Sequence, residues 1–104
     1  MIIAVDFDGT LVKNTYPAIE NPNMELIEWI KNNREGNIFI LWTCRHGIEL
    51  DKAICWLQEQ NIVFDYVNEN VPALLAKYGD CRKVYADIYI DDSACRDVND
   101  LRRN

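Results

Sequence analysis

Two aspartates, Asp6 and Asp8, directly follow a short apolar run at the start of the chain. Residues 1–5 are apolar and rich in β-branched side chains, which is typical of a strand covered on both faces. Side chains two positions apart on an extended chain point the same way, so we expect the two carboxylates to converge. Two anions at close range repel each other unless one is protonated or a cation lies between them. The spacing therefore predicts a site for acid–base chemistry or for a cation.

Polar side chains also follow two later apolar runs. Thr43 comes after residues 38–42, and Asp91 and Asp92 come after residues 88–90. In an open parallel sheet, ligands bind in the crevice beyond the carboxyl ends of the strands. Ordinary strand-end turns are the alternative interpretation, but chance would not place polar groups at these ends while keeping the strands apolar. We therefore expect one site, built from the ends of several strands.

The run Asp6-Phe7-Asp8-Gly9-Thr10 resembles the first motif of the haloacid-dehalogenase-like superfamily of phosphohydrolases. Thr43 resembles its second motif, Lys83 its third, and the run from Ile88 to Asp92 its fourth. Arg82 competes with Lys83 for the third position. The resemblance spans nearly the whole chain, and four motifs in order are far more specific than any one of them.

The resemblance implies a role for each matched residue. Asp6 would be the nucleophile that accepts the phosphoryl group as an aspartyl-phosphate. Asp8 would protonate the leaving oxygen and then activate water as a base. Thr43 and Lys83 would hold the phosphoryl oxygens, where charge builds up in the transition state. Lys83 would also keep Asp6 ionised, because a nearby cation lowers the pKa of a carboxyl group.

The resemblance also implies a magnesium site and contacts to the substrate. Mg²⁺ prefers hard oxygen ligands and bridges carboxylates to substrate phosphates. The expected metal ligands are Asp6, Asp91, Asp92 and the backbone carbonyl of Asp8. The expected substrate contacts are Gly9, Thr10, Thr43, Lys83 and Arg45. For Arg45 and its neighbour His46, contact with the substrate and simple solvation are equally compatible with the sequence.

Strand-like and helix-like segments alternate along the chain, which indicates an α/β fold with a parallel sheet. The expected strands are residues 1–5, 38–42, 62–67 and 88–90, and the expected helices begin at residues 21, 48 and 72 and after residue 92. Together with the resemblance, this predicts a single domain over residues 1–104. We expect a Rossmann-like three-layer sandwich with a mainly parallel sheet of about four strands in the order 4-1-2-3.

Two departures from the superfamily pattern bear on partners. The segments between the motifs are too short for a cap domain, so the chain resembles the capless members. We also expect the fifth core strand that is usual in the family to be absent, which would leave the fourth strand at an edge of the sheet. Exposed edges invite pairing with another chain, so we expect a homodimer.

Composition limits the classes of protein and partner. The chain has 104 residues, of which 49% are hydrophobic and 27% charged, with a net charge of −6. This balance is typical of a globular domain and argues against broad binding to nucleic acid or anionic membranes. No apolar run approaches the ~20 residues that a membrane-spanning helix needs. The four cysteines form no metal-binding pattern, so we expect reduced thiols and a cytoplasmic location.

The sequence thus predicts a magnesium-dependent phosphatase that acts on an unidentified phosphomonoester, either small or attached to a macromolecule. A phosphotransferase, which passes the group to an alcohol instead of water, is one alternative. A binding module for phosphate or metal, with weak turnover or none, is the other. The carboxylate at Asp8 argues against the module, because binding alone needs no general acid.

Overall fold

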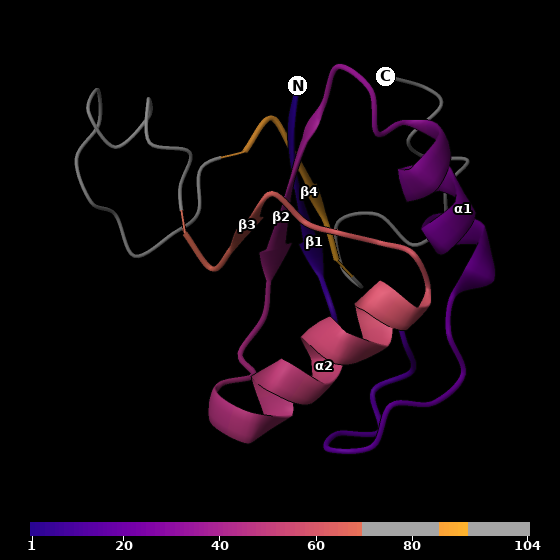
Figure 1. Cartoon of the computed structure of the whole chain (residues 1–104), viewed down its shortest axis with the longest axis vertical. Helices are drawn as coiled ribbons and strands as arrows, with labels where there is room; N and C mark the ends of the chain where they lie inside the picture. Colours follow the sequence, from indigo (N-terminus) through magenta and orange to yellow (C-terminus); the bar gives the residue numbers. More distant parts are fainter. Residues whose placement is uncertain (70–85, 92–104) are drawn as a thin grey trace.

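A computed structural model describes residues 1–69 and 86–91 of the chain (Figure 1). The elements are β1 (Ile2–Asp6), α1 (Met24–Asn32), β2 (Ile38–Trp42), α2 (Gly47–Glu59), β3 (Tyr66–Val67) and β4 (Ile88–Ile90). The four strands form one parallel sheet in the order β3-β2-β1-β4. This is the predicted order 4-1-2-3 read from the opposite edge, so the α/β class and the parallel sheet are confirmed.

Strand β1 lies in the interior of the sheet and fixes the register of its neighbours. It pairs with β2 from Ile2 opposite Ile38 to Asp6 opposite Trp42. On its other side it pairs with β4, where Val5 lies opposite Ile90. The central residues of β1 and β2 are fully buried, which agrees with their uninterrupted apolar sequences.

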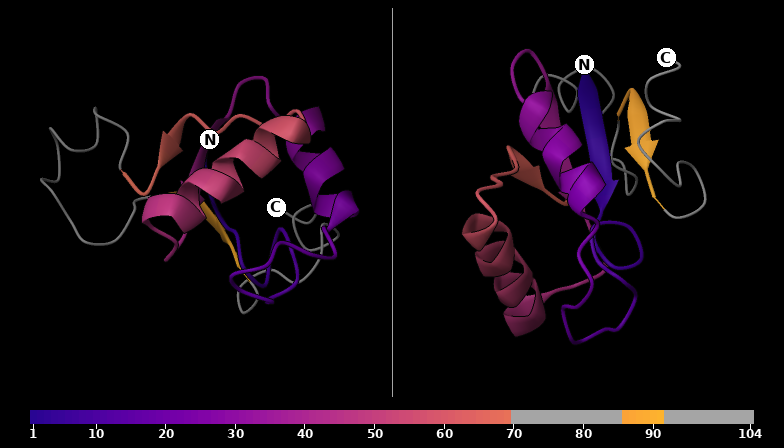
Figure 2. Two further views of the ribbon diagram at one scale, coloured as in Figure 1. Left: turned by 60° about the horizontal axis from the view of Figure 1, so that its bottom comes forward. Right: turned by 90° about the vertical axis from the view of Figure 1, so that its right-hand side faces the viewer.

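The two faces of the sheet carry different partners. One face packs against both α1 and α2, and its core includes Ile3 and Leu41 from the strands with Ile27 and Leu57 from the helices (Figure 2). On the other face, Ala4 and Ile40 form a second buried cluster together with further strand side chains. The helices predicted at residues 72–77 and after residue 92 lie outside the described residues, so the three-layer sandwich stays a prediction.

Helix α1 begins later than the sequence suggests. The sequence predicts a helix that begins at residue 21, but Asn23 is the cap and α1 begins at Met24. The side-chain oxygen of Asn23 accepts the backbone N–H of Leu26 at 3.1 Å. Asn21 adopts a left-handed conformation with φ of 50°, which no helix start allows. Asn23, two residues further along the chain, therefore caps the helix.

Strand β3 is shorter than the predicted range of residues 62–67. The carboxylate of Asp65 accepts the backbone N–H of Phe39 at 2.9 Å, a hydrogen bond that a backbone carbonyl of a longer β3 would otherwise accept. The same carboxylate binds Arg34 through two hydrogen bonds of 2.7 Å. Those bonds lower the pKa of Asp65, against the opposing effect of its partial burial, and raise the pKa of Arg34.

Among the described residues, β4 pairs with β1 alone and so lies at an edge of the sheet. The homodimer that we expected from such an edge stays a prediction. In the same residues, no helix is both long and apolar enough to cross a membrane.

The two-helix core yields a stability prediction. Ile27 on α1 is fully buried, so Ile27→Ala should lower the free energy of unfolding by about 2–5 kcal/mol through lost burial and a residual cavity. Ile48 on α2 is 71% exposed, and Ile48→Ala should change the free energy of unfolding by less than about 0.5 kcal/mol. Urea unfolding followed by circular dichroism measures both. Equal effects of the two variants would show that α1 does not pack as described.

Candidate active site

A pocket of about 220 Å³ lies at the carboxyl ends of the strands. The described residues that line it are Asp6, Trp42, Thr43, Cys44 and Asp91. They come from the end of β1, from the end of β2 and the residues that follow it, and from the residue after β4. The pocket therefore brings together three of the predicted site residues: the expected nucleophile Asp6, the phosphoryl-binding residue Thr43 and the metal ligand Asp91.

The strand register explains why these residues meet. Asp6 lies opposite Trp42, so the next residue of the chain, Thr43, stands directly beyond it. Val5 lies opposite Ile90, which places Asp91 level with Asp6 on the other side. Two carboxylates and a hydroxyl therefore face one pocket from three adjacent strands.

The turn after β1 is fixed by backbone hydrogen bonds. The carbonyl of Phe7 accepts the N–H groups of Thr10 at 3.2 Å and Leu11 at 3.0 Å. Gly9 has a φ of 88°, in the left-handed region that favours glycine. The hydroxyl of Thr10 is buried and lies 3.5 Å from Oδ2 of Asp6, at the long limit of a hydrogen bond. Gly9 and Thr10 thus shape the turn, and Thr10 also approaches the Asp6 carboxylate. Their predicted contacts with the substrate stay a prediction.

Thr43 is oriented by two partners that leave its hydroxyl proton available. The backbone N–H of Arg45 donates to Thr43 Oγ1 at 3.1 Å, so this oxygen already accepts a hydrogen bond. The backbone N–H of Thr43 donates to the side-chain oxygen of Asn68 at 2.8 Å. A hydroxyl that accepts on one side keeps its own proton to donate on another. Thr43 can therefore donate to an anion through its hydroxyl, while its backbone N–H is occupied.

Asn68 is a site residue that the sequence reasoning missed. It follows β3, as Thr43 follows β2, so every strand of the sheet ends in a polar side chain. Its φ of 53° lies in the left-handed region, which asparagine tolerates better than most residues. Its position directly after β3 could have indicated a role in the site, but the apolar pattern of this strand is weak, so the end of the strand was hard to recognise.

Asp8 and Arg45 form an ion pair that the sequence reasoning missed. Asp8 is not among the described residues that line the pocket, and its carboxylate binds the guanidinium of Arg45 through two hydrogen bonds of 2.8 Å. The Arg45 side chain is only 1% exposed, so the predicted contact between Arg45 and the substrate is replaced by this internal ion pair. Hydrogen bonding to Asp8 raises the pKa of Arg45, against the opposing effect of burial.

Other predicted positions are not brought into the site. Lys83 and Asp92 lie outside the described residues. His46 is exposed, and its Nδ1 lies 3.4 Å from the backbone carbonyl oxygen of Cys44. Within residues 1–69 and 86–91, no group of three or more His, Cys, Asp or Glu side chains is arranged to hold a metal ion. Of the expected metal-ligating carboxylates, Asp6 and Asp91 line the pocket, and Asp92 lies outside the described residues.

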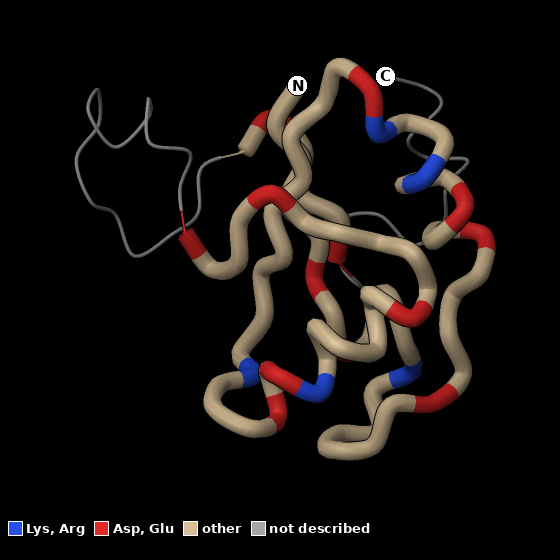
Figure 3. Tube along the Cα trace, viewed as in Figure 1, with Lys and Arg blue, Asp and Glu red and all other residues tan. Residues whose placement is uncertain are grey.

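Charged residues are spread along the described part of the chain. Acidic residues outnumber basic ones, and the two kinds are interspersed (Figure 3).

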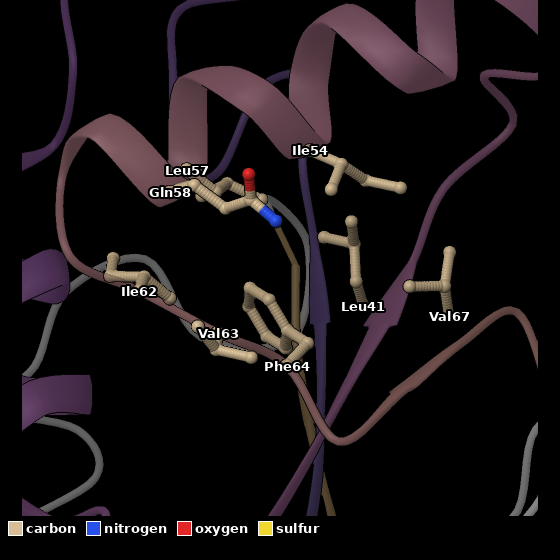
Figure 4. Close-up of a pocket in the computed structure, with 8 residues that line it drawn as sticks. All are labelled: Leu41, Ile54, Leu57, Gln58, Ile62, Val63, Phe64 and Val67. Carbon is tan, nitrogen blue, oxygen red and sulfur yellow. The ribbon is translucent and has the colours of Figure 1, made fainter.

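A second pocket, of about 140 Å³, lies between α2 and the sheet (Figure 4). Its lining is apolar except for one amide, and consists of Leu41, Ile54, Leu57, Gln58, Ile62, Val63, Phe64 and Val67. Without an ionisable group, this second pocket cannot support acid–base or nucleophilic chemistry.

The chain is similar to a solved structure of a conserved protein from Bacteroides thetaiotaomicron. The two sequences are 36% identical, and the match covers 97% of this chain and 85% of the other, with a TM-score of 0.83. No protein-family model matches the chain. No curated protein matches it either.

The burial of the Arg45–Asp8 pair predicts a difference from the Arg34–Asp65 pair, which is also joined by two hydrogen bonds. Arg45→Met should lower the free energy of unfolding by about 3 kcal/mol, because it leaves the partly buried Asp8 carboxylate without its cation. In the Arg34–Asp65 pair both side chains are about one third exposed, so Arg34→Met should cost about 1 kcal/mol or less. Urea unfolding measures the free energy of unfolding of both variants. Equal losses in Arg45→Met and Arg34→Met would show that the greater burial of the Arg45–Asp8 pair does not matter for stability.

Proposed function

We propose that this chain, which belongs to the same family as the conserved protein from Bacteroides thetaiotaomicron, is a magnesium-dependent phosphatase of the haloacid-dehalogenase-like superfamily. One observation carries the proposal: Asp6, Thr43 and Asp91 line a single pocket at the carboxyl ends of three adjacent parallel strands. These residues supply a carboxylate nucleophile, a hydroxyl donor for a phosphoryl oxygen and a second carboxylate for a metal ion, which are three of the roles in phosphoryl transfer to an aspartate.

In the proposed first step, a carboxylate oxygen of Asp6 attacks the phosphorus of a phosphomonoester. The new bond joins this oxygen to phosphorus, and the bond between phosphorus and the leaving oxygen breaks. The hydroxyl of Thr43 donates to a phosphoryl oxygen, where negative charge increases in the transition state. Asp8, in its protonated form, supplies the proton that the leaving oxygen takes up as an alcohol, and becomes a carboxylate.

In the second step, water attacks the phosphorus of the aspartyl-phosphate. Asp8, now ionised, removes the proton from this water, and the bond between Asp6 and phosphorus breaks. Inorganic phosphate leaves, Asp6 is restored as a carboxylate, and Asp8 is again protonated for the next cycle. The same two carboxylates therefore serve both steps.

The donor set of the pocket fits Mg²⁺. This ion is usually held by one or two carboxylates together with waters and substrate phosphate, and the pocket offers the carboxylates of Asp6 and Asp91. The backbone carbonyl of Asp8 is the third expected ligand, while its carboxylate is bound to Arg45. When bound, Mg²⁺ would neutralise part of the charge on the carboxylates and on the phosphoryl group.

The proposed substrate is a phosphomonoester, either small or attached to a macromolecule. We place the reaction in the cytoplasm, where the exposed thiols of Cys44 and Cys55 stay reduced. A phosphotransferase would use the same first step and pass the group to an alcohol in place of water. A binding module would use the pocket without turnover. Phosphate release in the absence of any alcohol acceptor separates the phosphatase from both alternatives.

The nucleophile provides the decisive test of this function. Asp6→Asn should abolish phosphate release over a panel of phosphorylated metabolites, because an amide is a poor nucleophile and forms no acyl-phosphate. Asp51→Asn on α2, which removes the same charge from an exposed position, should keep full activity. A malachite green assay with magnesium present measures both. Phosphate release that survives in Asp6→Asn would exclude this mechanism.

The metal assignment is tested by thermal unfolding. Magnesium at a hundredfold excess over its Kd should stabilise the folded protein by about 2.7 kcal/mol, which raises Tm by several degrees. Asp91→Asn should weaken this rise, and Asp51→Asn should leave it unchanged because Asp51 does not line the pocket. Should wild type show no magnesium-dependent rise, the metal assignment would be wrong.

A further inference from the structure

The Asp8 carboxylate is held in one orientation by Arg45. Nε of Arg45 donates to Oδ2 and Nη2 donates to Oδ1, each at 2.8 Å, which is the parallel two-bond geometry of a strong charge-assisted pair. The Asp8 side chain is 19% exposed, whereas that of Arg45 is 1% exposed. Arg45 thus covers the inner side of the carboxylate and leaves part of it open to solvent. Each carboxylate oxygen keeps a second lone pair that Arg45 does not use.

Arg45 is itself fixed by aromatic rings. Its guanidinium carbon lies 4.9 Å from the ring centre of Phe7 and 4.9 Å from that of Tyr16. A cation over an aromatic face is attracted by the negative charge of that face. Phe7 is buried and precedes Asp8 in the chain, whereas Tyr16 is half exposed. The guanidinium plane is therefore held on the same turn that carries Asp8.

The remaining donors of Arg45 reach backbone groups of two other segments. Nη1 donates to the carbonyls of Pro17 at 3.3 Å and Glu49 at 3.4 Å, and Nη2 donates to the carbonyl of Ala18 at 3.3 Å. The Glu49 carboxylate also lies 3.9 Å from Nη1. Arg45 therefore joins the turn after β1, the loop before α1 and the first turn of α2. A side chain with so many contacts has little freedom to move.

We propose that Arg45 is the positioning residue for proton transfer in this site: it fixes the carboxylate of Asp8 on the turn that follows β1, two residues after the pocket residue Asp6. The inference rests on the proposed function, in which Asp8 exchanges protons with the leaving oxygen and with water. A general acid or base works only within hydrogen-bonding reach of its proton partner. Because Asp8 lies on a partly exposed turn, an unrestrained side chain would sample other rotamers and lose that geometry.

The chain offers a matched control pair away from the pocket. Arg34 also binds Asp65 through two hydrogen bonds, here from Nη1 and Nη2, and it too lies over an aromatic ring, at 5.5 Å from the centre of Phe39. Neither Arg34 nor Asp65 lines the pocket at the carboxyl ends of the strands. Lysine in place of either arginine keeps the charge but cannot make the two parallel bonds.

The test compares Arg45→Lys and Arg34→Lys on two phosphomonoesters. Glycerol 2-phosphate has a poor leaving group that needs a proton, whereas 4-nitrophenyl phosphate has a good leaving group that does not. The value of kcat/KM reports only the steps up to phosphoryl transfer to Asp6. Inhibition by inorganic phosphate measures whether the pocket still binds a phosphoryl group.

For Arg45→Lys we expect kcat/KM on glycerol 2-phosphate to fall by about 10- to 100-fold, part of the usual contribution of a positioned acid. The loss on 4-nitrophenyl phosphate should be much smaller, and the inhibition constant of phosphate should stay the same. Arg34→Lys should change none of these values. If the role of Arg45 were purely structural, Arg45→Lys would lower kcat/KM equally on the two substrates.

Three results would overturn the inference. The first is an equal fall in kcat/KM of Arg45→Lys on the two substrates. The second is an unchanged or raised kcat/KM on glycerol 2-phosphate. The third is a weakened inhibition by phosphate. If Arg45→Lys does not fold, Tyr16→Leu takes its place, since it removes the half-exposed Tyr16 ring from the guanidinium of Arg45. Tyr16→Leu should show the same selective loss at smaller size, and no loss would overturn the inference. Wild type that releases phosphate from neither ester would instead remove the proposed function, and the inference with it.

Discussion

The parallel pairing of β1 with a strand on each side is the constraint on which the candidate site depends. Hydrogen bonds along both edges of β1 leave one register for β2 and one for β4. A shift of one residue would turn the side chains of a strand to the opposite face of the sheet. It would therefore separate Asp6 from Thr43 or from Asp91, and it would also expose the apolar residues that fill the core. The packing of the core and the geometry of the site are thus fixed by the same register.

The features of the fold that follow from uninterrupted apolar runs could be predicted from the sequence. Residues 38–42 and 88–90 form strands with the expected bounds, and the parallel sheet follows from the alternation of strands and helices. The strand order was expected from the resemblance to the superfamily. The same reasoning placed Asp6, Thr43 and Asp91 together, because the carboxyl ends of parallel strands share one edge of the sheet. Such patterns repeat along the chain, and each repeat strengthens the inference.

Features that depend on one side chain reaching across the fold could not be predicted. Asp8 and Arg45 are 37 residues apart, and each alone has a plausible role in the pocket, so the sequence does not reveal that they bind each other. Asp65 shortens β3 in the same way, by binding the backbone of Phe39 in place of a neighbouring strand. In each case a polar side chain has several chemically reasonable partners, and only the three-dimensional arrangement selects one.

The long separation between β1 and β4 has a consequence for the order of folding. The backbone N–H of Ile2 binds the carboxylate of Asp87, 85 residues further along the chain. Contacts between residues this far apart form late, because a long loop must close before they contribute any stability. During synthesis on the ribosome, β1, β2 and both helices emerge before β4 does. A nascent chain can therefore bring Asp6 beside Thr43 while Asp91 is still absent, so the second carboxylate of the pocket is its last described component to arrive.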